Sequence, residues 1–279
     1  MFFVREPVVV GKFYENTQEK LKKSISNFFE STKKIKNKKK IRGGIVPHAA
    51  YKYSGSIAST FYNLLDSNVE TNFIILVPNH SLAGADFALM KKGLWKTPLG
   101  SVSTHSSMAE KITELTELVE HDVIPHQYDH ALEVQLPFLQ YKFGNDFKFV
   151  PISIKSEVPS EKLEKNTKIL GNAIADAIGT SEENWLILAS SDFSHYISEK
   201  EAKKIDRKII NSIIKLNTKK LFKTAKEKNA SLCGIGAIST AINAVKKMGS
   251  RSGKLLEYGT SADTNHDISS VVGYASILL

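Results

Sequence analysis

Three largely apolar runs, each as long as a β-strand, constrain the fold of this chain most, and the first of them is unbroken from Phe73 to Pro78. They are "NFIILVP" (72–78), "FKFVPISI" (147–154) and "WLILAS" (185–190). A strand with one wet face alternates apolar and polar residues, so an unbroken run is typical of a strand covered on both faces. Segments with helical periodicity separate the runs. The sequence therefore predicts an α/β fold with a central, mostly parallel or mixed sheet flanked by helices on both faces.

The remaining elements follow the same alternation along the chain. We expect helices at 16–32, capped by Asn16 or Thr17, from Ser54 onward, and at 106–119, 130–142, 160–178, 198–215 and 218–228, with a last one starting near Cys233. Further strands are expected at 43–47, 254–259 and 270–279. No linker, repeat or low-complexity tract divides the sequence, which favours a single domain over residues 1–279.

The sequence composition bears on the cellular compartment of the protein. No apolar stretch reaches the roughly 18 residues that a membrane helix needs, and Arg5, Glu6 and Pro7 interrupt the apolar N-terminus in a way that does not fit a signal peptide. The chain has one cysteine, which excludes an internal disulfide framework and fits a reducing compartment. We expect a cytoplasmic protein without a membrane partner.

The net charge of +9 raises nucleic acid as a partner. Much of the excess lies in "KKIKNKKK", residues 33–40, between a predicted helix and a predicted strand. Lysines are common at helix C-termini and in solvated loops, and no nucleic-acid-binding module accompanies them. We interpret the run as a surface connection, dispensable for folding, and expect no nucleic-acid partner.

Polar side chains collect just after several predicted strands. His48 follows "GGIVP", Asn79 and His80 follow "FIILVP", and Asp192, Ser194 and His195 follow "WLILASS". Ligands of open α/β sheets bind outside the carboxyl ends of the strands. A single histidine there is usually a loop residue, but the same placement three times over predicts a site.

Two short motifs add candidate groups. Asp192 and His195 lie three residues apart, so on a helical turn they would face one side and act as an acid–base pair, or else form an N-cap with an exposed histidine. His130 and Glu133 have the same spacing and form either a site wall or a capped helix start, with Pro137 ending or kinking the helix. We expect His130, Glu133 and Tyr51 to contact a substrate, and take His121 and His126 as surface residues.

Cys233 lies in "SLCGIGAIST" at a predicted helix start. A lone thiol among small apolar residues is more often a packing residue. A helix N-terminus, however, lowers the pKa of a thiol and favours the thiolate that binds metals or attacks carbonyls.

Taken together, the motifs resemble those of the Memo family. The stretches that carry the resemblance are "VREPVVVGKFYE", "GGIVPHAAYKYSG", "LVPNHSLAG", "DHALEVQLPFL", "SSDFSHY", "LCGIGAI" and "SSVVGYASILL". They lie in order along nearly the whole chain. The family is similar in fold to the LigB-like class III extradiol dioxygenases, which implies one α/β domain with its site at an edge of the sheet.

The resemblance also implies a set of site residues. The family pocket of two histidines and a cysteine matches His48, His80 and Cys233 as metal ligands, with Asp192 and His195 beside them as catalytic groups. The carboxylate ligand of the ring-cleaving dioxygenases has no counterpart in these motifs. A dimer would fit many relatives.

Three functions remain open at this point. The first is an oxidoreductase that uses iron or copper, because two histidines and an anionic ligand suit either metal. The second is a hydrolase with Cys233 as nucleophile. The third is a protein that binds a peptide or small molecule without turnover.

Overall fold

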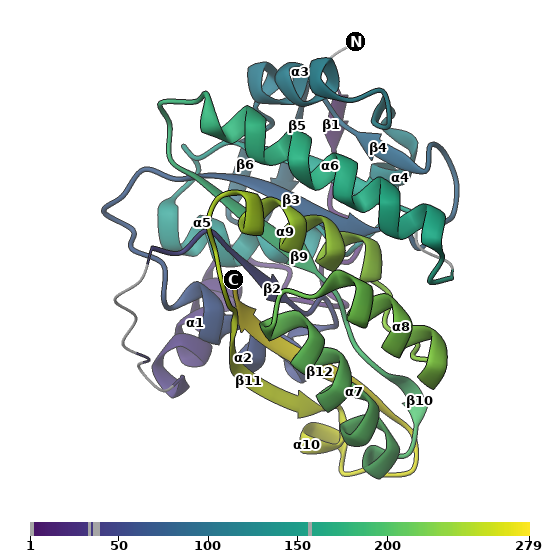
Figure 1. The fold of residues 1–279 in the computed structure, drawn as a ribbon. Coiled ribbons are helices and arrows are strands. Elements are labelled where there is room, and N and C mark those ends of the chain that lie inside the picture. The colour runs from purple at the N-terminus through teal and green to yellow at the C-terminus, as the bar shows by residue number, and fades with distance from the viewer. Residues whose placement is uncertain (1–2, 33–34, 36–39, 156–157) are drawn as a thin grey trace.

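The computed structural model describes residues 3–32, 35, 40–155 and 158–279, and most of them are organised around one mixed sheet (Figure 1). Along that sheet the strands follow the order β10-β12-β2-β9-β3-β8-β4-β7, and β11 pairs with β12 beside this path. The strand bounds are β2 (Gly43–Val46), β3 (Asn72–Pro78), β4 (Phe87–Leu89), β7 (Glu120–His121), β8 (Phe149–Ile154), β9 (Trp185–Ser190), β10 (His195–Ile197), β11 (Lys254–Thr260) and β12 (Val271–Leu278).

The centre of the sheet is parallel and its flanks are antiparallel. Strand β9 lies between β2 and β3, and β8 pairs with β3, all in parallel. Strand β12 runs antiparallel to β2, and β4 runs antiparallel to β8. The predicted α/β fold with a mixed sheet is confirmed, and the three strands expected to carry the site are neighbours.

Both faces of the sheet are covered, which explains the unbroken apolar runs. In β3, Ile74 and Leu76 join a core with residues of the helices on one face, while Phe73, Ile75 and Val77 join a second core on the other. The first face is covered chiefly by α6 (Glu161–Gly179), α9 (Ile235–Lys247) and, toward β12, α7 (Glu199–Ile214) and α8 (Thr218–Lys228). The second is covered by α1 (Gln18–Ser31), α2 (Tyr51–Tyr62) and α5 (Leu136–Phe143).

Most predicted helices form, with shifted ends. Thr17 caps α1, as expected, by accepting a hydrogen bond from the backbone N–H of Lys20. Helix α2 begins at Tyr51, three residues before the expected start, and α3 covers Ser106–Leu115. The helix expected at 130–142 is instead a 3-10 turn, η1 (Glu133–Gln135), followed by α5. Pro137 lies in the first turn of α5, where its missing N–H costs nothing, so the expectation that it ends or kinks a helix was wrong.

Several short elements were not predicted. Strands β1 (Phe3–Arg5), β5 (Gly93–Thr97) and β6 (Gly100–Ser103) form a separate small sheet. Short helices lie at α4 (Ile124–Gln127) and α10 (Ala262–Asn265). The lysine run 33–40 falls largely outside the described residues, so its expected surface placement stays a prediction.

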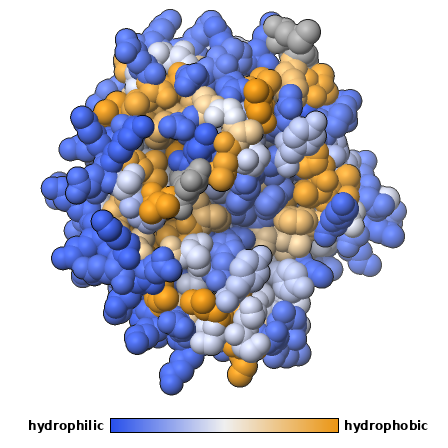
Figure 2. Space-filling view, turned by 90° about the vertical axis from the view of Figure 1, so that its right-hand side faces the viewer, coloured by the Kyte–Doolittle hydropathy of each residue, from blue (hydrophilic) through white to orange (hydrophobic). Residues whose placement is uncertain are grey.

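The carboxyl ends of β2, β3 and β9 point to one edge of the sheet, as their parallel pairing requires. Figure 2 views the molecule from that side, where hydrophobic residues lie among hydrophilic ones around the centre of the face. Among the helices of the described residues, none is long and apolar enough to cross a membrane.

Candidate functional site

Two histidines meet at the carboxyl edge of the sheet. His48 follows β2 and His80 follows β3, and their ring centroids are 5.1 Å apart although 32 positions separate them in the sequence. His48 is 2 % exposed, whereas the side chain of His80 is 35 % exposed, so the pair reaches from the interior to the surface. The two strand ends therefore converge as their placement in the sequence predicts.

A third histidine completes the cluster. The ring of His130 stacks on that of His80 at 4.9 Å with an interplanar angle of 9°, and lies 5.5 Å from the ring of His48. Phe13 packs against His130 in an edge-to-face contact, with ring centroids 4.8 Å apart. One nitrogen from each of the three histidines lies within 4.8 Å of the others, a spacing from which small shifts would bring all three onto one metal ion.

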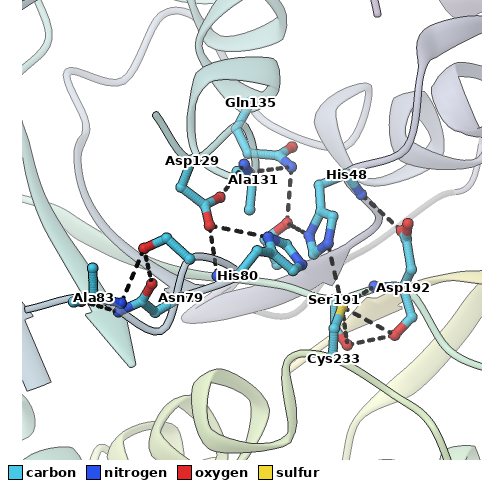
Figure 3. A network of polar contacts seen from close by, with 12 residues as sticks. His48, Asn79, His80, Ala83, Asp129, Ala131, Gln135, Ser191, Asp192 and Cys233 are labelled. Atoms are coloured by element: carbon cyan, nitrogen blue, oxygen red, sulfur yellow. Dashed lines mark hydrogen bonds and ion pairs between the residues drawn. The ribbon is translucent and has the colours of Figure 1, made fainter. Parts of the chain in front are cut away.

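Asp129 orients His80. Its Oδ2 accepts from the backbone N–H of His80 at 2.8 Å and lies 3.0 Å from Nδ1 of the ring (Figure 3). Its Oδ1 accepts from the backbone N–H of Ala131 at 2.8 Å. A carboxylate on Nδ1 leaves Nε2 as the free nitrogen, which is the arrangement behind many metal-binding histidines. Asp129 was not predicted as a site residue, although it directly precedes His130 in the "DHALE" motif.

His48 is fixed through its other nitrogen. Nδ1 lies 2.8 Å from Oγ of Ser190 at the end of β9, and Ser190 also accepts from Nε2 of Gln135 at 2.9 Å. Gln135 in turn accepts from the hydroxyl of Tyr62 at 2.7 Å. Burial, and then the neighbouring histidines His80 and His130, hold the pKa of His48 well below its ordinary value. The imidazole is therefore neutral and presents Nε2 to the site.

Cys233 faces that nitrogen. Its Sγ lies 3.2 Å from Nε2 of His48 and accepts from the backbone N–H of Asp192 at 3.3 Å (Figure 3). Gly234 allows this approach, because a side chain there would collide with the carbonyl oxygen of Ser190 and the side chain of Ser191. The thiol precedes α9, as expected, but burial raises its pKa even though the hydrogen bond from His80 opposes the rise. The expected lowering by the helix start is thus outweighed.

The charge of His80 depends on its two partners. Burial alone would lower its pKa, but the hydrogen bonds with Asp129 and Cys233 outweigh burial and raise the pKa to about 10. The same contact lowers the pKa of Asp129 against the effect of its burial. The cluster therefore carries a proton on His80 that an incoming cation would displace.

Asp192 is present at the site, but it does not form the pair with His195 that a helical turn would have allowed. Residues 191–194 form no helical turn, and β10 starts at His195. Asp192 accepts from the backbone N–H of His48 at 2.9 Å, whereas Nδ1 of His195 lies 2.8 Å from the carbonyl oxygen of Ser231. The long-range contacts of each residue have replaced the local pair.

Burial gives Asp192 an unusual acidity. It raises the pKa of the carboxyl to about 7, although the hydrogen bond from the backbone N–H of His48 works in the other direction. A carboxyl group with such a pKa can gain and lose a proton near neutral pH, which suits general acid–base work. The assignment of Asp192 and His195 as catalytic groups stays a prediction.

Glu133 and Tyr51 lie behind the site. Glu133 is fully buried and forms an ion pair with Arg5, and the hydroxyl of Tyr51 donates to the carbonyl of Val134 at 2.7 Å. Both brace the segment that carries His130, and their expected contact with a substrate stays a prediction. His126 was expected at the surface but is 1 % exposed, because it packs beneath Trp95 and contacts the carbonyl of Ala88.

This arrangement defines an α/β protein with a cluster of histidines, a thiol and a buried carboxyl group at the carboxyl edge of a mixed sheet. The family model described as "Memo-like protein" matches residues 5–278. The chain belongs to the Memo family.

Relatives of full length share this assignment. MEMO1 family proteins of Nitrosopumilus maritimus and Sulfolobus acidocaldarius are each 38% identical to this chain, with 98% of both chains covered. The MEMO1 family protein of Methanosarcina acetivorans is 36% identical over 99% of both chains.

One solved structure shows the fold alone. The crystal structure of an uncharacterised protein from Escherichia coli K12 aligns with a TM-score of 0.51 at 12% identity, covering 86% of this chain and 100% of that one.

Proposed function

We propose that the histidine cluster and Cys233 bind one redox-active transition-metal ion, iron or copper, and that the protein is a metal-dependent oxidoreductase acting on a small molecule. The observation that carries the proposal is that, in two of the histidines, one ring nitrogen is hydrogen-bonded and the other is left for a ligand. Nδ1 of His48 and Nδ1 of His80 are occupied by Ser190 and Asp129, so each ring offers Nε2 to the same space.

The donor set fits such an ion. Neutral imidazoles are common ligands of iron and copper, and a thiolate adds the soft, anionic donor that copper in particular prefers. His48, His80 and Cys233 would hold the ion, with His130 near enough to be a further ligand. A bound ion would supply one-electron chemistry, which no side chain of the cluster offers on its own.

The side chains around the cluster would manage protons and position. Asp129 fixes the ring plane of His80, and Ser190 fixes that of His48. Asp192, with its pKa raised to about 7 by burial, would give a proton to the substrate or take one from it. The partly exposed edge of His80 leaves a way in for a small molecule.

The first test is the metal content of the protein purified without added metal, followed by a redox titration of the loaded protein. We expect close to one iron or copper per chain and a reversible one-electron change. His80→Ala should lose the metal, whereas His266→Asn, an exposed histidine with a left-handed backbone that asparagine tolerates, should keep it. Retention of the metal by His80→Ala would contradict the proposal.

One contact favours a second candidate function. The 3.2 Å approach of Cys233 Sγ to Nε2 of a neutral His48 is the pairing used by cysteine hydrolases, with Ser190 orienting the imidazole. Against it, burial raises the pKa of the thiol. A metal-free protein that is alkylated at Cys233 far faster than a free thiol at neutral pH would favour this hydrolase.

A further inference from the structure

A hollow of about 360 Å³ lies between helix α7 and strand β11, away from the residues of the histidine site. The helix contributes Lys203, Arg207, Ile210 and Ile214, which share one face because they are spaced three or four residues apart. The strand contributes Leu255 and Tyr258. Most of the wall is thus apolar, the helix adds the cations Lys203 and Arg207 at one end, and Asn211 adds one polar side chain.

An irregularity in β11 builds the apolar wall. Residues 255 and 258 would face opposite sides of a regular strand, but the pairing with β12 shifts register between Leu255 and Glu257. The extra residue returns Tyr258 to the side of Leu255, as a β-bulge does. Leu255 is 38 % exposed, so the bulge places an aliphatic side chain at the mouth of the hollow.

The two cations of the hollow, Lys203 and Arg207, differ in their partners. Lys203 pairs with Glu199 at 2.8 Å. Arg207 takes part in no ion pair or side-chain hydrogen bond within residues 3–32, 35, 40–155 and 158–279. A guanidinium beside an apolar wall is complementary to a ligand that carries one carboxylate on an aliphatic chain.

Hydrogen bonds to a buried carboxylate hold the side chain of Tyr258 in place. The hydroxyl of Tyr258 donates to Oδ2 of the buried Asp206 at 2.8 Å, and Oδ1 of Asp206 accepts from the hydroxyl of Ser194 at 2.6 Å. This chain of hydrogen bonds fixes the ring before any ligand arrives, which reduces the entropy lost on binding.

We propose that the hollow between α7 and β11 binds a medium-chain aliphatic carboxylate, with its chain against Ile210, Leu255 and Tyr258 and its carboxylate on Arg207. The volume lies at the lower end of the range for small-molecule sites. At ~30 Å³ per water molecule it corresponds to about a dozen non-hydrogen atoms, which is the size of an eight- to ten-carbon acid.

The test is isothermal titration calorimetry of the full chain with octanoate. We expect saturable binding of one equivalent, roughly tenfold weaker binding of hexanoate, which lacks two methylene groups, and clearly weaker binding of the uncharged 1-octanol. Arg207→Gln should weaken octanoate binding about tenfold. Lys208→Gln, on the exposed neighbour of Arg207, should leave binding unchanged.

Leu255→Ser provides a second variant at a half-exposed position where folding tolerates the change, and it should weaken octanoate binding several-fold. Thermal melting checks that each variant is folded. Absence of saturable heat with millimolar octanoate would overturn the proposal. So would equal binding of octanoate and 1-octanol, or undiminished octanoate binding by both Arg207→Gln and Leu255→Ser.

Discussion

The buried pair of Arg5 and Glu133 should be one of the most sensitive points of the fold. The side chains are 1% and 0% exposed, and they join β1 to the turn that follows His130. Besides Arg5, Glu133 accepts hydrogen bonds from the backbone N–H groups of Val8 at 2.9 Å and Val9 at 3.1 Å, and from the hydroxyl of Tyr14 at 2.6 Å. All four of these groups are donors.

Glu133→Gln keeps the shape but removes the charge and turns one acceptor oxygen into a donor. Arg5 would then be a buried cation without its counter-charge, and at least one donor around the side chain would lose its acceptor. Breaking a buried ion pair on one side costs about 3–5 kcal/mol, so we expect the free energy of unfolding to fall by that amount. Arg5 also donates to the carbonyl of Asp129 at 2.7 Å, so His130 and Asp129 should become more mobile.

Urea unfolding followed by circular dichroism measures this loss. Glu6→Gln is the matched control, because Glu6 pairs with Lys96 at 2.6 Å with side chains 64% and 44% exposed, and exposed pairs contribute under about 1 kcal/mol. The double variant Arg5→Met, Glu133→Leu should be less destabilised than the sum of its parts. A loss below about 1 kcal/mol for Glu133→Gln would refute the reasoning.

Three further predictions concern single residues. Burial lowers the pKa of His126 from 6.5 to about 4, so the unfolded chain gains a proton at this residue before the folded chain does as the pH falls. The free energy of unfolding should therefore drop by about 3 kcal/mol between pH 6.5 and 4. Urea titrations of His126→Gln over the same pH range should show a loss that is smaller by that amount. Asp129→Asn should weaken metal binding about 10- to 100-fold in a competition assay, and unchanged affinity in the folded variant would mean that Asp129 does not orient His80. Cys233→Ser should keep the fold but bind Cu⁺ far more weakly, and wild-type Cu⁺ affinity in this variant would make the thiol a packing residue.

The positions of His48 and His80 could be predicted from the sequence because strand direction determines them. Parallel strands end at one edge of a sheet, so polar residues after two buried strands are brought together whatever lies between them. Strand direction also predicts which edge of the sheet carries the candidate site. It could not place His130, because His130 approaches from the irregular segment before η1.

Local spacing was a poor guide where tertiary contacts compete with it. Asp192 and His195 have the spacing of a helical pair, yet the backbone N–H of His48 and the carbonyl of Ser231 take up their polar atoms. In the sequence, His126 is one histidine among several in a polar segment. Its packing against Trp95 is visible only in the folded chain. Partners more than 30 residues away in the sequence leave no periodic signal.

The short strands were missed for a different reason. Strand β5 alternates buried and half-buried residues over five positions, and a turn at Pro98 and Leu99 connects it to β6, which begins at Gly100. Gly100 has a φ of +126°, which a glycine adopts readily. Alternation together with Pro and Gly is the usual signal of a hairpin, so this element could have been found from the sequence.

The most direct test of a metal centre built by His48 and His80 is an anaerobic titration of the metal-free protein with Fe²⁺ and with Cu⁺. We expect one tight site per chain for at least one ion, lost in His48→Ala and in His80→Ala and kept in His266→Asn. Binding of equal strength in all four proteins, or no tight binding of either ion by the wild type, would contradict it.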